Sequence, residues 1–218
     1  MKALSPQQTG KYASWAFAEA RPVEDDVLLM ARDRSAELGI TPVSEGTASM
    51  LTFLAAASRP QTMVELGTGA GVSGLALMRG APTGAVLTSL DPDAEAQRAA
   101  REVFVADGYP SSTTRLIAGR GRTVLPKLSA SAYDLVFIDA DPLLLEYHVT
   151  EAARVLRSGG TVIIHDALDQ DRVPRPAVRD ASTVMLREVG NILRDATSVW
   201  RTSALIPTGT GLLLATRA

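Results

Sequence analysis

The 218-residue sequence contains no cysteine. Disulfide bonds, thiolate nucleophiles and cysteine-ligated zinc sites are therefore excluded, so any chemistry must come from oxygen and nitrogen groups. The sequence also lacks a basic head followed by an apolar core and a cleavage site, and no apolar run reaches the ~20 residues that span a bilayer. We expect a cytoplasmic protein that does not associate with membranes.

An excess of charge of one sign is missing as well. The 22 basic and 24 acidic side chains leave a formal charge of -2. Because this balance gives no global electrostatic footprint for nucleic acid, we do not expect a nucleic-acid partner. The length and the 46% of hydrophobic residues fit one domain over 1–218. We expect a helical leader over 1–60 and an α/β core over 61–218.

The first sixty residues have helical character. One helix is predicted to begin near Ser5, with proline at the next position, a second around 22–26 and a third at Ser44. Bulky aromatic residues lie largely on one side of the first helix, namely Tyr12, Trp15 and Phe17. These aromatics are predicted to make core or dimer contacts, and a substrate pocket is the less favoured alternative.

From residue 62 onward, short apolar segments alternate with amphipathic ones, which indicates a doubly wound parallel sheet. The predicted strands cover 62–66, 85–90, 113–118, 133–138 and 159–164. The predicted helices lie near 71–79, 93–107, 121–128, 143–156 and 177–194, and a hairpin of two strands over 198–206 and 212–216 closes the chain. Because the carboxyl ends of parallel strands share one edge, ligands are expected there.

A glycine-rich turn over 67–71 follows the first predicted strand and opens a helix. Its glycines allow positive φ and close approach of a ligand to the backbone and to free helix N–H groups. The dinucleotide fingerprint needs a further glycine where Val72 stands, so a nicotinamide-dependent reductase is a less favoured alternative. Glu65 beside the turn suits a cationic ligand, and Asp91 after the next strand can accept hydrogen bonds from ribose.

Two motifs carry a resemblance to a known family. Val-Glu-Leu-Gly-Thr-Gly-Ala-Gly over 64–71 resembles the first motif of class I S-adenosyl-L-methionine-dependent methyltransferases. Tyr-Asp-Leu-Val-Phe-Ile-Asp-Ala-Asp over 133–141 resembles the fourth-strand motif of the catechol and caffeoyl-CoA O-methyltransferases, and further similarity lies at Leu90-Asp91, 156–160 and 206–212. The resemblance covers nearly the whole chain.

This resemblance implies a Rossmann-like sheet of seven strands in the order three, two, one, four, five, seven, six, with one antiparallel strand. It implies transfer of a methyl group from S-adenosyl-L-methionine to a hydroxyl oxygen of a small-molecule acceptor. Relatives are commonly homodimers that use their leader helices. A protein that binds the cofactor but transfers no methyl group is the alternative.

The resemblance also implies a set of cofactor-binding residues. They are Val43, Glu65, Gly67, Thr68, Gly69, Ser73, Asp91, Pro92, Gly121, Arg122, Asp139 and Asp141. Within this set Val43 is expected beside the methionine part and Asp91 at the ribose hydroxyls. Gly121 and Arg122 are expected along the adenine.

The metal site of the family is incomplete in this sequence. Metal-dependent relatives use the acid at Asp139, an Asp-Asn pair after the fifth strand and a lysine three positions after the first acid. This chain has Asp166-Ala167 and Pro142 at the latter places. A hard divalent cation such as Mg²⁺ favours about six oxygen ligands, and only Asp139 and Asp166 remain as candidates. Substitution by Asp169 or by water stays open.

Loss of the lysine makes His165 a candidate general base beside the catalytic Asp139. An imidazole with a pKa near ~6.5 suits proton transfer at neutral pH. The other interpretation of His165 is a hydrogen-bonded histidine at a strand end. His148 lies inside a predicted helix and is expected to be structural.

Overall fold

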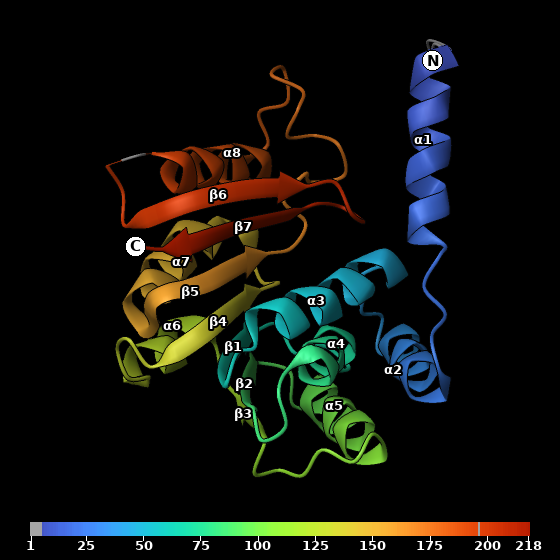
Figure 1. Ribbon diagram of the computed structural model, residues 1–218, viewed down its shortest axis with the longest axis vertical. Helices are drawn as coiled ribbons and strands as arrows, with labels where there is room; N and C mark the ends of the chain where they lie inside the picture. Colours follow the sequence, from blue (N-terminus) through green and yellow to red (C-terminus); the bar gives the residue numbers. More distant parts are fainter. Residues whose placement is uncertain (1–5, 196) are drawn as a thin grey trace.

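The computed structural model describes residues 6–195 and 197–218. In this part of the chain seven strands form one sheet in the order β3-β2-β1-β4-β5-β7-β6 (Figure 1). The strands are β1 Thr62–Leu66, β2 Val86–Asp91, β3 Thr114–Ala118, β4 Tyr133–Ile138, β5 Leu156–Ile164, β6 Trp200–Ile206 and β7 Leu212–Arg217. Strand β7 runs antiparallel to both β5 and β6, whereas β1 to β5 pair in parallel. The predicted fold class, strand order and single antiparallel strand are confirmed.

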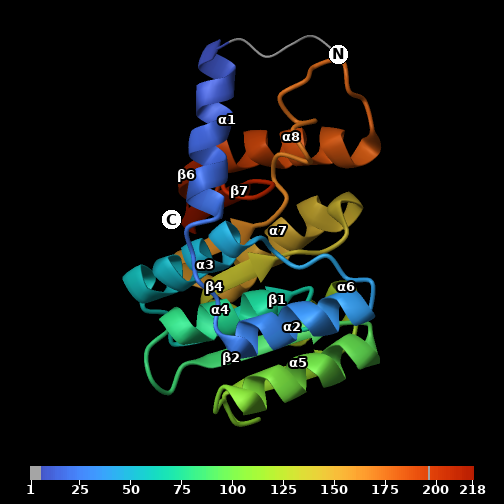
Figure 2. The ribbon, with the colours of Figure 1, turned by 90° about the vertical axis from the view of Figure 1, so that its right-hand side faces the viewer.

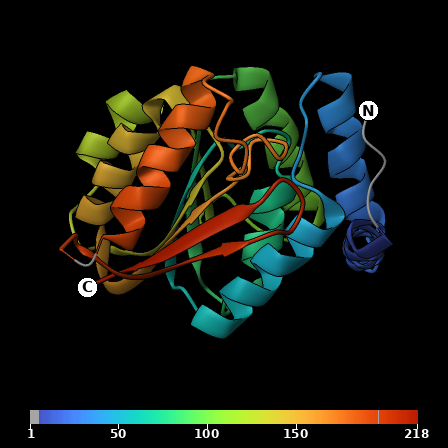
Figure 3. The ribbon, with the colours of Figure 1, turned by 90° about the horizontal axis from the view of Figure 1, so that it is seen from above.

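Helices cover both faces of this sheet (Figure 3). The α-helices are α1 Pro6–Glu19, α2 Asp26–Glu37, α3 Glu45–Ser58, α4 Val72–Gly80, α5 Ala94–Ala106, α6 Gly121–Val124, α7 Leu145–Val155 and α8 Ala181–Arg194. Two 3₁₀ turns, η1 Leu125–Lys127 and η2 Pro142–Leu144, adjoin α6 and α7. The predicted helix start at Ser5 lies outside the described residues. None of the described helices has the length and apolarity needed to cross a bilayer.

Some predicted boundaries differ from the structure for local reasons. The helices predicted over 121–128 and 143–156 are each divided into an α-helix and a 3₁₀ turn. A proline lies in the first two positions of both 3₁₀ turns, and its missing N–H and fixed φ favour a tighter turn there. Strand β5 begins at Leu156 rather than at 159, with a register shift against β4. Helix α8 begins at Ala181 rather than at 177.

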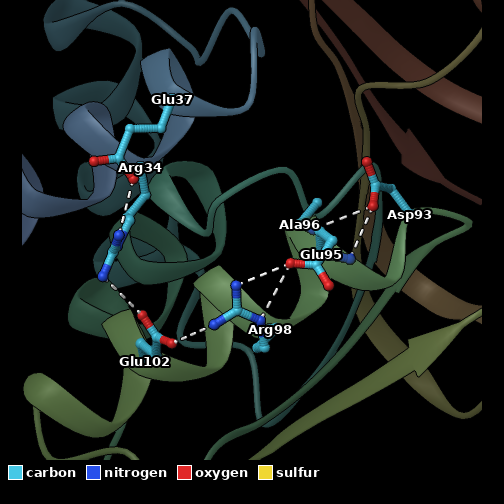
Figure 4. Close-up of polar contacts among 7 residues, drawn as sticks. All are labelled: Arg34, Glu37, Asp93, Glu95, Ala96, Arg98 and Glu102. Carbon is cyan, nitrogen blue, oxygen red and sulfur yellow. Dashed lines mark hydrogen bonds and ion pairs between the residues drawn. The ribbon is translucent and has the colours of Figure 1, made fainter.

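Hydrogen-bonding residues at the helix N-termini explain where several helices begin. Ser44 accepts from the Thr47 N–H at 3.1 Å and caps α3, which begins at Glu45, next to the predicted start. Asp93 accepts from the backbone N–H groups of Glu95 and Ala96 and caps α5 (Figure 4). Such caps satisfy N–H groups that have no partner inside the helix. The cap of α5 fixes Asp93 beside the carboxyl end of β2.

An exposed ion-pair network joins α2 to α5 (Figure 4). Arg34 contacts Glu37 at 2.8 Å and Glu102 at 3.3 Å, and Arg98 contacts Glu102 at 3.0 Å. Solvent-exposed pairs contribute little to stability, because water screens them. The network therefore contributes little to the stability of the packing between α2 and α5.

Alternate residues of the central strands supply two apolar cores, one on each face of the sheet. Met63 of β1 belongs to the core under α3, α4 and α5, and its neighbour Val64 belongs to the core under α7 and α8. Both side chains are fully buried. Burial on both faces is typical of parallel strands and explains why the strand segments are nearly continuously apolar.

Helix α1 extends away from the rest of the molecule (Figures 1 and 2). Tyr12 and Phe17 are 62% and 75% exposed, so the alternative that these aromatics belong to the core is not realised in this chain alone. At the C-terminal end of the helix, Glu19 accepts hydrogen bonds from Ser44, Thr208 and the Gly209 N–H at 2.6–2.8 Å. Glu19 thus connects α1 to the turn between β6 and β7.

Candidate cofactor and catalytic site

The glycine turn after β1 has the backbone conformation that its sequence predicts. Gly67, Gly69 and Gly71 all have positive φ, at 92°, 49° and 96°. A Cβ at Gly67 would lie 1.9 Å from the backbone oxygen of Asp139. Glycine is therefore required at Gly67 both by its φ and by the close approach of β4.

Two cavities meet at this turn. The smaller, of about 270 Å³, is lined by Val43, Thr68, Gly69 and Ser73 among other residues. The larger, of about 600 Å³, extends past Pro92, Gly121, Arg122 and Asp141. Gly67, Asp91 and Asp139 line both cavities, so one elongated ligand can occupy the two together. The structure thus brings together eleven of the twelve residues predicted to bind the cofactor.

Among the described residues, Glu65 is the predicted cofactor contact that lines neither cavity. It is fully buried below the turn. Its Oε1 accepts from the Ser73 hydroxyl at 2.7 Å and its Oε2 from the Ser89 hydroxyl at 2.5 Å. Burial raises the pKa of Glu65 to about 7 against the opposing effect of these two hydrogen bonds. Glu65 is thus connected to the smaller cavity indirectly, through the Ser73 hydroxyl that lines it.

Further hydroxyl and amide groups continue this buried network. Gln97 Nε2 donates to the Thr68 hydroxyl at 2.8 Å, and the Thr68 and Ser89 hydroxyl oxygens are 2.6 Å apart. Because the Ser89 proton is used by Glu65, Thr68 must donate to Ser89. The order of donors, from Gln97 through Thr68 and Ser89 to Glu65, fits an ionised carboxylate that only accepts.

Asp91 occupies the junction of the two cavities. Its Oδ2 accepts from the Gly69 N–H at 3.0 Å, and its Oδ1 accepts from the Asp93 N–H at 2.9 Å. These bonds fix the carboxylate at the carboxyl end of β2, where the glycine turn faces it. Two oxygens with remaining acceptor capacity suit a vicinal diol such as ribose.

Asp139 and His165 form a pair at the ends of β4 and β5. His165 Nδ1 lies 2.9 Å from Asp139 Oδ1, and His165 Nε2 lies 3.4 Å from the Thr210 hydroxyl. Burial alone would lower the pKa of His165, but the hydrogen bond and charge of Asp139 raise it above its ordinary value. The carboxylate favours the tautomer with a proton on Nδ1, so Nε2 is left as an acceptor.

The residues after β5 do not provide a set of ligands for a hard divalent cation. Asp139 and Asp166 line a cavity of about 80 Å³ together with Asp169. Both Asp169 oxygens already accept hydrogen bonds, from Arg172 and Thr183. In the described ranges no three histidine, aspartate or glutamate side chains are arranged to hold a metal ion.

The predicted metal ligand Asp166 has a φ of 53°, and its Oδ1 is buried without a hydrogen-bond partner among the described residues. Together with Asp139 it supplies far fewer oxygens than the roughly six that a hard divalent cation favours. Ala167 at the next position offers no side-chain oxygen. The donor set therefore does not fit Mg²⁺.

Sequence reasoning did not single out three residues that the structure places in or under the site. Ser89 and Gln97 support Glu65, and Thr210 faces His165. The signal for Ser89 was a polar residue next to Thr88 in the middle of a buried strand. Thr210 lies on the closing turn, and its proximity to His165 depends on the pairing of β5 with β7.

Comparisons with known sequences agree with this geometry. A family model described as a methyltransferase domain matches residues 64–167. A Mycobacterium ulcerans protein that carries an O-methyltransferase name is 42% identical over 202 residues, which cover 93% of this chain and 89% of that protein. A Mycobacterium leprae protein with an O-methyltransferase name is 40% identical over 218 residues, or 99% of this chain and 96% of that protein.

Solved structures have the same fold. A crystal structure of a Corynebacterium glutamicum protein has a TM-score of 0.85 at 29% identity and covers 96% of this chain and 97% of that chain. The O-methyltransferase TomG of Streptomyces achromogenes, which takes part in tomaymycin synthesis and was crystallised with S-adenosylmethionine, has a TM-score of 0.83 at 23% identity, with coverage of 99% and 100%. The latter likeness concerns the fold alone.

Proposed function

Because this chain belongs to the O-methyltransferase family, we propose that it transfers a methyl group from S-adenosyl-L-methionine to a hydroxyl oxygen of a small-molecule acceptor, with His165 as the general base. The predicted enzyme class and methyl donor are those of this family, and the nicotinamide-dependent alternative is set aside. The observation that carries the proposal is the position of Asp139, which lines both cavities and also pairs with His165 at 2.9 Å.

The two connected cavities support one extended orientation of the cofactor. The methionine part occupies the smaller cavity beside Val43 and Ser73, and the adenosine occupies the larger one beside Gly121. Asp91 lies between them, where the ribose connects the two parts of the molecule. This orientation places the methyl-bearing sulfur near Asp139, at the junction.

The chemistry is an in-line displacement at an activated sulfonium. The acceptor hydroxyl gives its proton to His165 Nε2 while an oxygen electron pair forms the new bond to the methyl carbon. The carbon–sulfur bond breaks, its electrons remain on sulfur, and S-adenosylhomocysteine is released. Asp139 orients the imidazole and stabilises the imidazolium, and positioning of the two reactants supplies much of the acceleration. No step requires a bound cation.

The proposal includes a homodimer in which the exposed aromatic side of α1 is covered. Tyr12 and Phe17 support this, because large apolar side chains on a projecting helix favour association. A cytoplasmic location with neither nucleic acid nor membrane as partner is supported by the absence of cysteine and by the balanced charge. Light scattering of the protein and of a Phe17→Ser variant tests the association.

The proposed function is tested by calorimetric titration of the cofactor product and by turnover measurements on a panel of acceptors. S-adenosylhomocysteine is titrated into chelator-treated protein, and labelled methyl transfer is measured with catechol and carboxylated phenols, with and without Mg²⁺. In the His165→Gln variant we expect kcat to fall by about 100-fold or more, because a positioned base contributes this much, while the S-adenosylhomocysteine Kd stays within about twofold.

Other outcomes separate the alternatives. Full turnover in the His165→Gln variant would exclude histidine as the base. A rate that depends on added Mg²⁺ would restore the metal-assisted mechanism despite Ala167. Binding of S-adenosylhomocysteine with no turnover on any acceptor of the panel would favour a protein that binds the cofactor without transferring a methyl group.

A further inference from the structure

A second histidine lies inside the larger cavity and has no role in the transfer step. His148 on α7 lines this cavity and is only 3% exposed. Neither of its ring nitrogens has a hydrogen-bond partner among the described residues. Buried polar groups in folded proteins nearly always have a partner, because leaving one without a hydrogen bond costs free energy. An imidazole with two free nitrogens in a ligand cavity therefore points to a ligand.

Gly121 is adapted to this histidine. A Cβ at Gly121 would lie 2.9 Å from His148 Nε2, closer than side-chain atoms normally approach. The backbone of Gly121 does not have positive φ, so its conformation does not require glycine. Glycine is required because the imidazole of His148 occupies the space that a Cβ would need. Gly121 belongs to the segment that lies along the adenine in the proposed orientation, so Nε2 faces that segment.

The surroundings of His148 are suited to a purine. Leu66, Leu90 and Leu144 supply apolar surface for the faces of an aromatic ring. Arg122, which could compete for hydrogen bonds, lies over the Tyr147 ring at 5.5 Å from its centroid. Burial lowers the pKa of His148, with a smaller opposing effect of Asp141. The neutral imidazole therefore offers one donor and one acceptor, and the adenine edge has both kinds of partner.

From these contacts we infer that His148 is a binding residue of the adenine subsite and hydrogen-bonds the edge of the purine ring, and that the missing Cβ of Gly121 makes room for its imidazole. The inference rests on the proposed function, since it needs S-adenosylmethionine as the ligand. It replaces the expectation from sequence that His148 is only structural. It also gives this residue a part in cofactor selection, because the unpaired imidazole would penalise a ring that lacks the matching atom.

Binding of ring analogues tests this inference. The Kd of S-adenosylhomocysteine and of its 1-deaza, 3-deaza, 7-deaza and hypoxanthine analogues is measured by calorimetry for the wild type and for His148→Phe and His148→Asn. We expect the wild type to bind one analogue about tenfold more weakly than the parent and His148→Phe to lose this discrimination. His148→Phe should bind the parent about tenfold more weakly, and His148→Asn should recover part of the loss.

A second variant keeps the histidine in the sequence but displaces its imidazole ring. Gly121→Ala should displace the ring and reproduce the loss of discrimination, so the test does not depend on the folding of His148→Phe. Gly190→Ala in α8 is the matched control, because no described atom lies within 4 Å of the Cβ it adds. We expect no change in this control.

The contrary results are equally definite. If His148→Phe binds every analogue like the wild type and melts at a higher temperature, the imidazole is a buried residue without a ligand and the inference is overturned. If the wild type does not bind S-adenosylhomocysteine at all, the proposed function itself fails. The wild-type titration thus distinguishes the two failures.

Discussion

The carboxyl edge of the sheet has two halves that differ in how completely they are built. In the half around β1 and β2, Glu65 and Asp91 accept hydrogen bonds at both of their oxygens. In the half after β5, Asp166 has a buried oxygen without a partner among the described residues. Four non-glycine residues within this short segment have positive φ, namely Asp166, Asp169, Gln170 and Asp171.

This difference shows which half of the edge contains strained backbone. A non-glycine residue at positive φ costs on the order of 1 kcal/mol, so the half after β5 holds strained backbone beside His165. The half around β1 is preformed for a ligand of fixed chemistry. The half after β5 is also where the chain departs from the metal-dependent pattern at Ala167, and a second departure, Pro142, follows β4. Variants in the two halves should therefore have different effects.

The strongest way to break the preformed half is Gly67→Ala. The added Cβ would meet the Asp139 backbone oxygen at 1.9 Å, so β4 must move away from the turn. We expect binding of S-adenosylhomocysteine to weaken by more than about 100-fold, since positioning lost here affects both cavities. Calorimetric Kd values and melting temperatures measure the effect.

Gly84→Ala provides the matched control for Gly67→Ala. Gly84 has a similar φ of 85°, but no described atom lies within 4 Å of its added Cβ. It should lower stability by about 1 kcal/mol through backbone strain and leave the Kd unchanged. If Gly67→Ala behaves like Gly84→Ala, the close contact with β4 is not needed for binding.

The effect expected from Glu65→Gln is on stability, and it depends on pH. The pKa of Glu65 in the folded protein, about 7, lies above the ordinary value of 4.5. The raised pKa stabilises the folded state fully below pH 4.5, and this contribution is lost as the pH rises through 7. Relative to Glu65→Gln, the wild type should thus lose roughly 3 kcal/mol of unfolding free energy over this range.

Urea denaturation at several pH values measures this difference between the two proteins. Glu102→Gln, on the exposed side of α5, should leave the pH dependence unchanged and serves as the control. Parallel curves for the wild type and Glu65→Gln would show that the pKa of Glu65 is the same in the folded and unfolded states, so that burial does not raise it.

The positions of residues along the sheet edge can be predicted from sequence where the signal is local. The glycine turn, Asp91 and Asp139 follow directly from short motifs at strand ends, and a parallel sheet brings such ends together. Sequence reasoning did not predict that Glu65 lies below the cavity, because this placement depends on contacts with Ser73 and Ser89, which are distant from Glu65 in sequence. The contact of Thr210 with His165 could not be predicted, because it requires the register of an antiparallel strand added at the end of the chain.

The smallest effect expected concerns the connection between α1 and the half after β5. Glu19 accepts from Thr208 at 2.8 Å and from the Gly209 N–H at 2.7 Å, and Thr210 on the same turn faces His165. Burial opposes ionisation of Glu19, but its hydrogen bonds with Ser44, Gly209 and Thr208 lower its pKa overall. The carboxylate is therefore charged at neutral pH and holds the turn in place.

In Glu19→Ala we expect the turn to loosen and kcat to fall by about threefold, because the imidazole loses a fixed neighbour while its pairing with Asp139 remains. The Kd of S-adenosylhomocysteine should stay unchanged, since Glu19 lines neither cavity among the described residues. Glu45→Ala, which removes a neighbouring acid in the first turn of α3, is the control. A Kd that changes as much as kcat would show that the two halves of the edge are coupled through α3. The two halves would then differ in their hydrogen bonding and backbone strain, but not in their effect on cofactor binding and turnover.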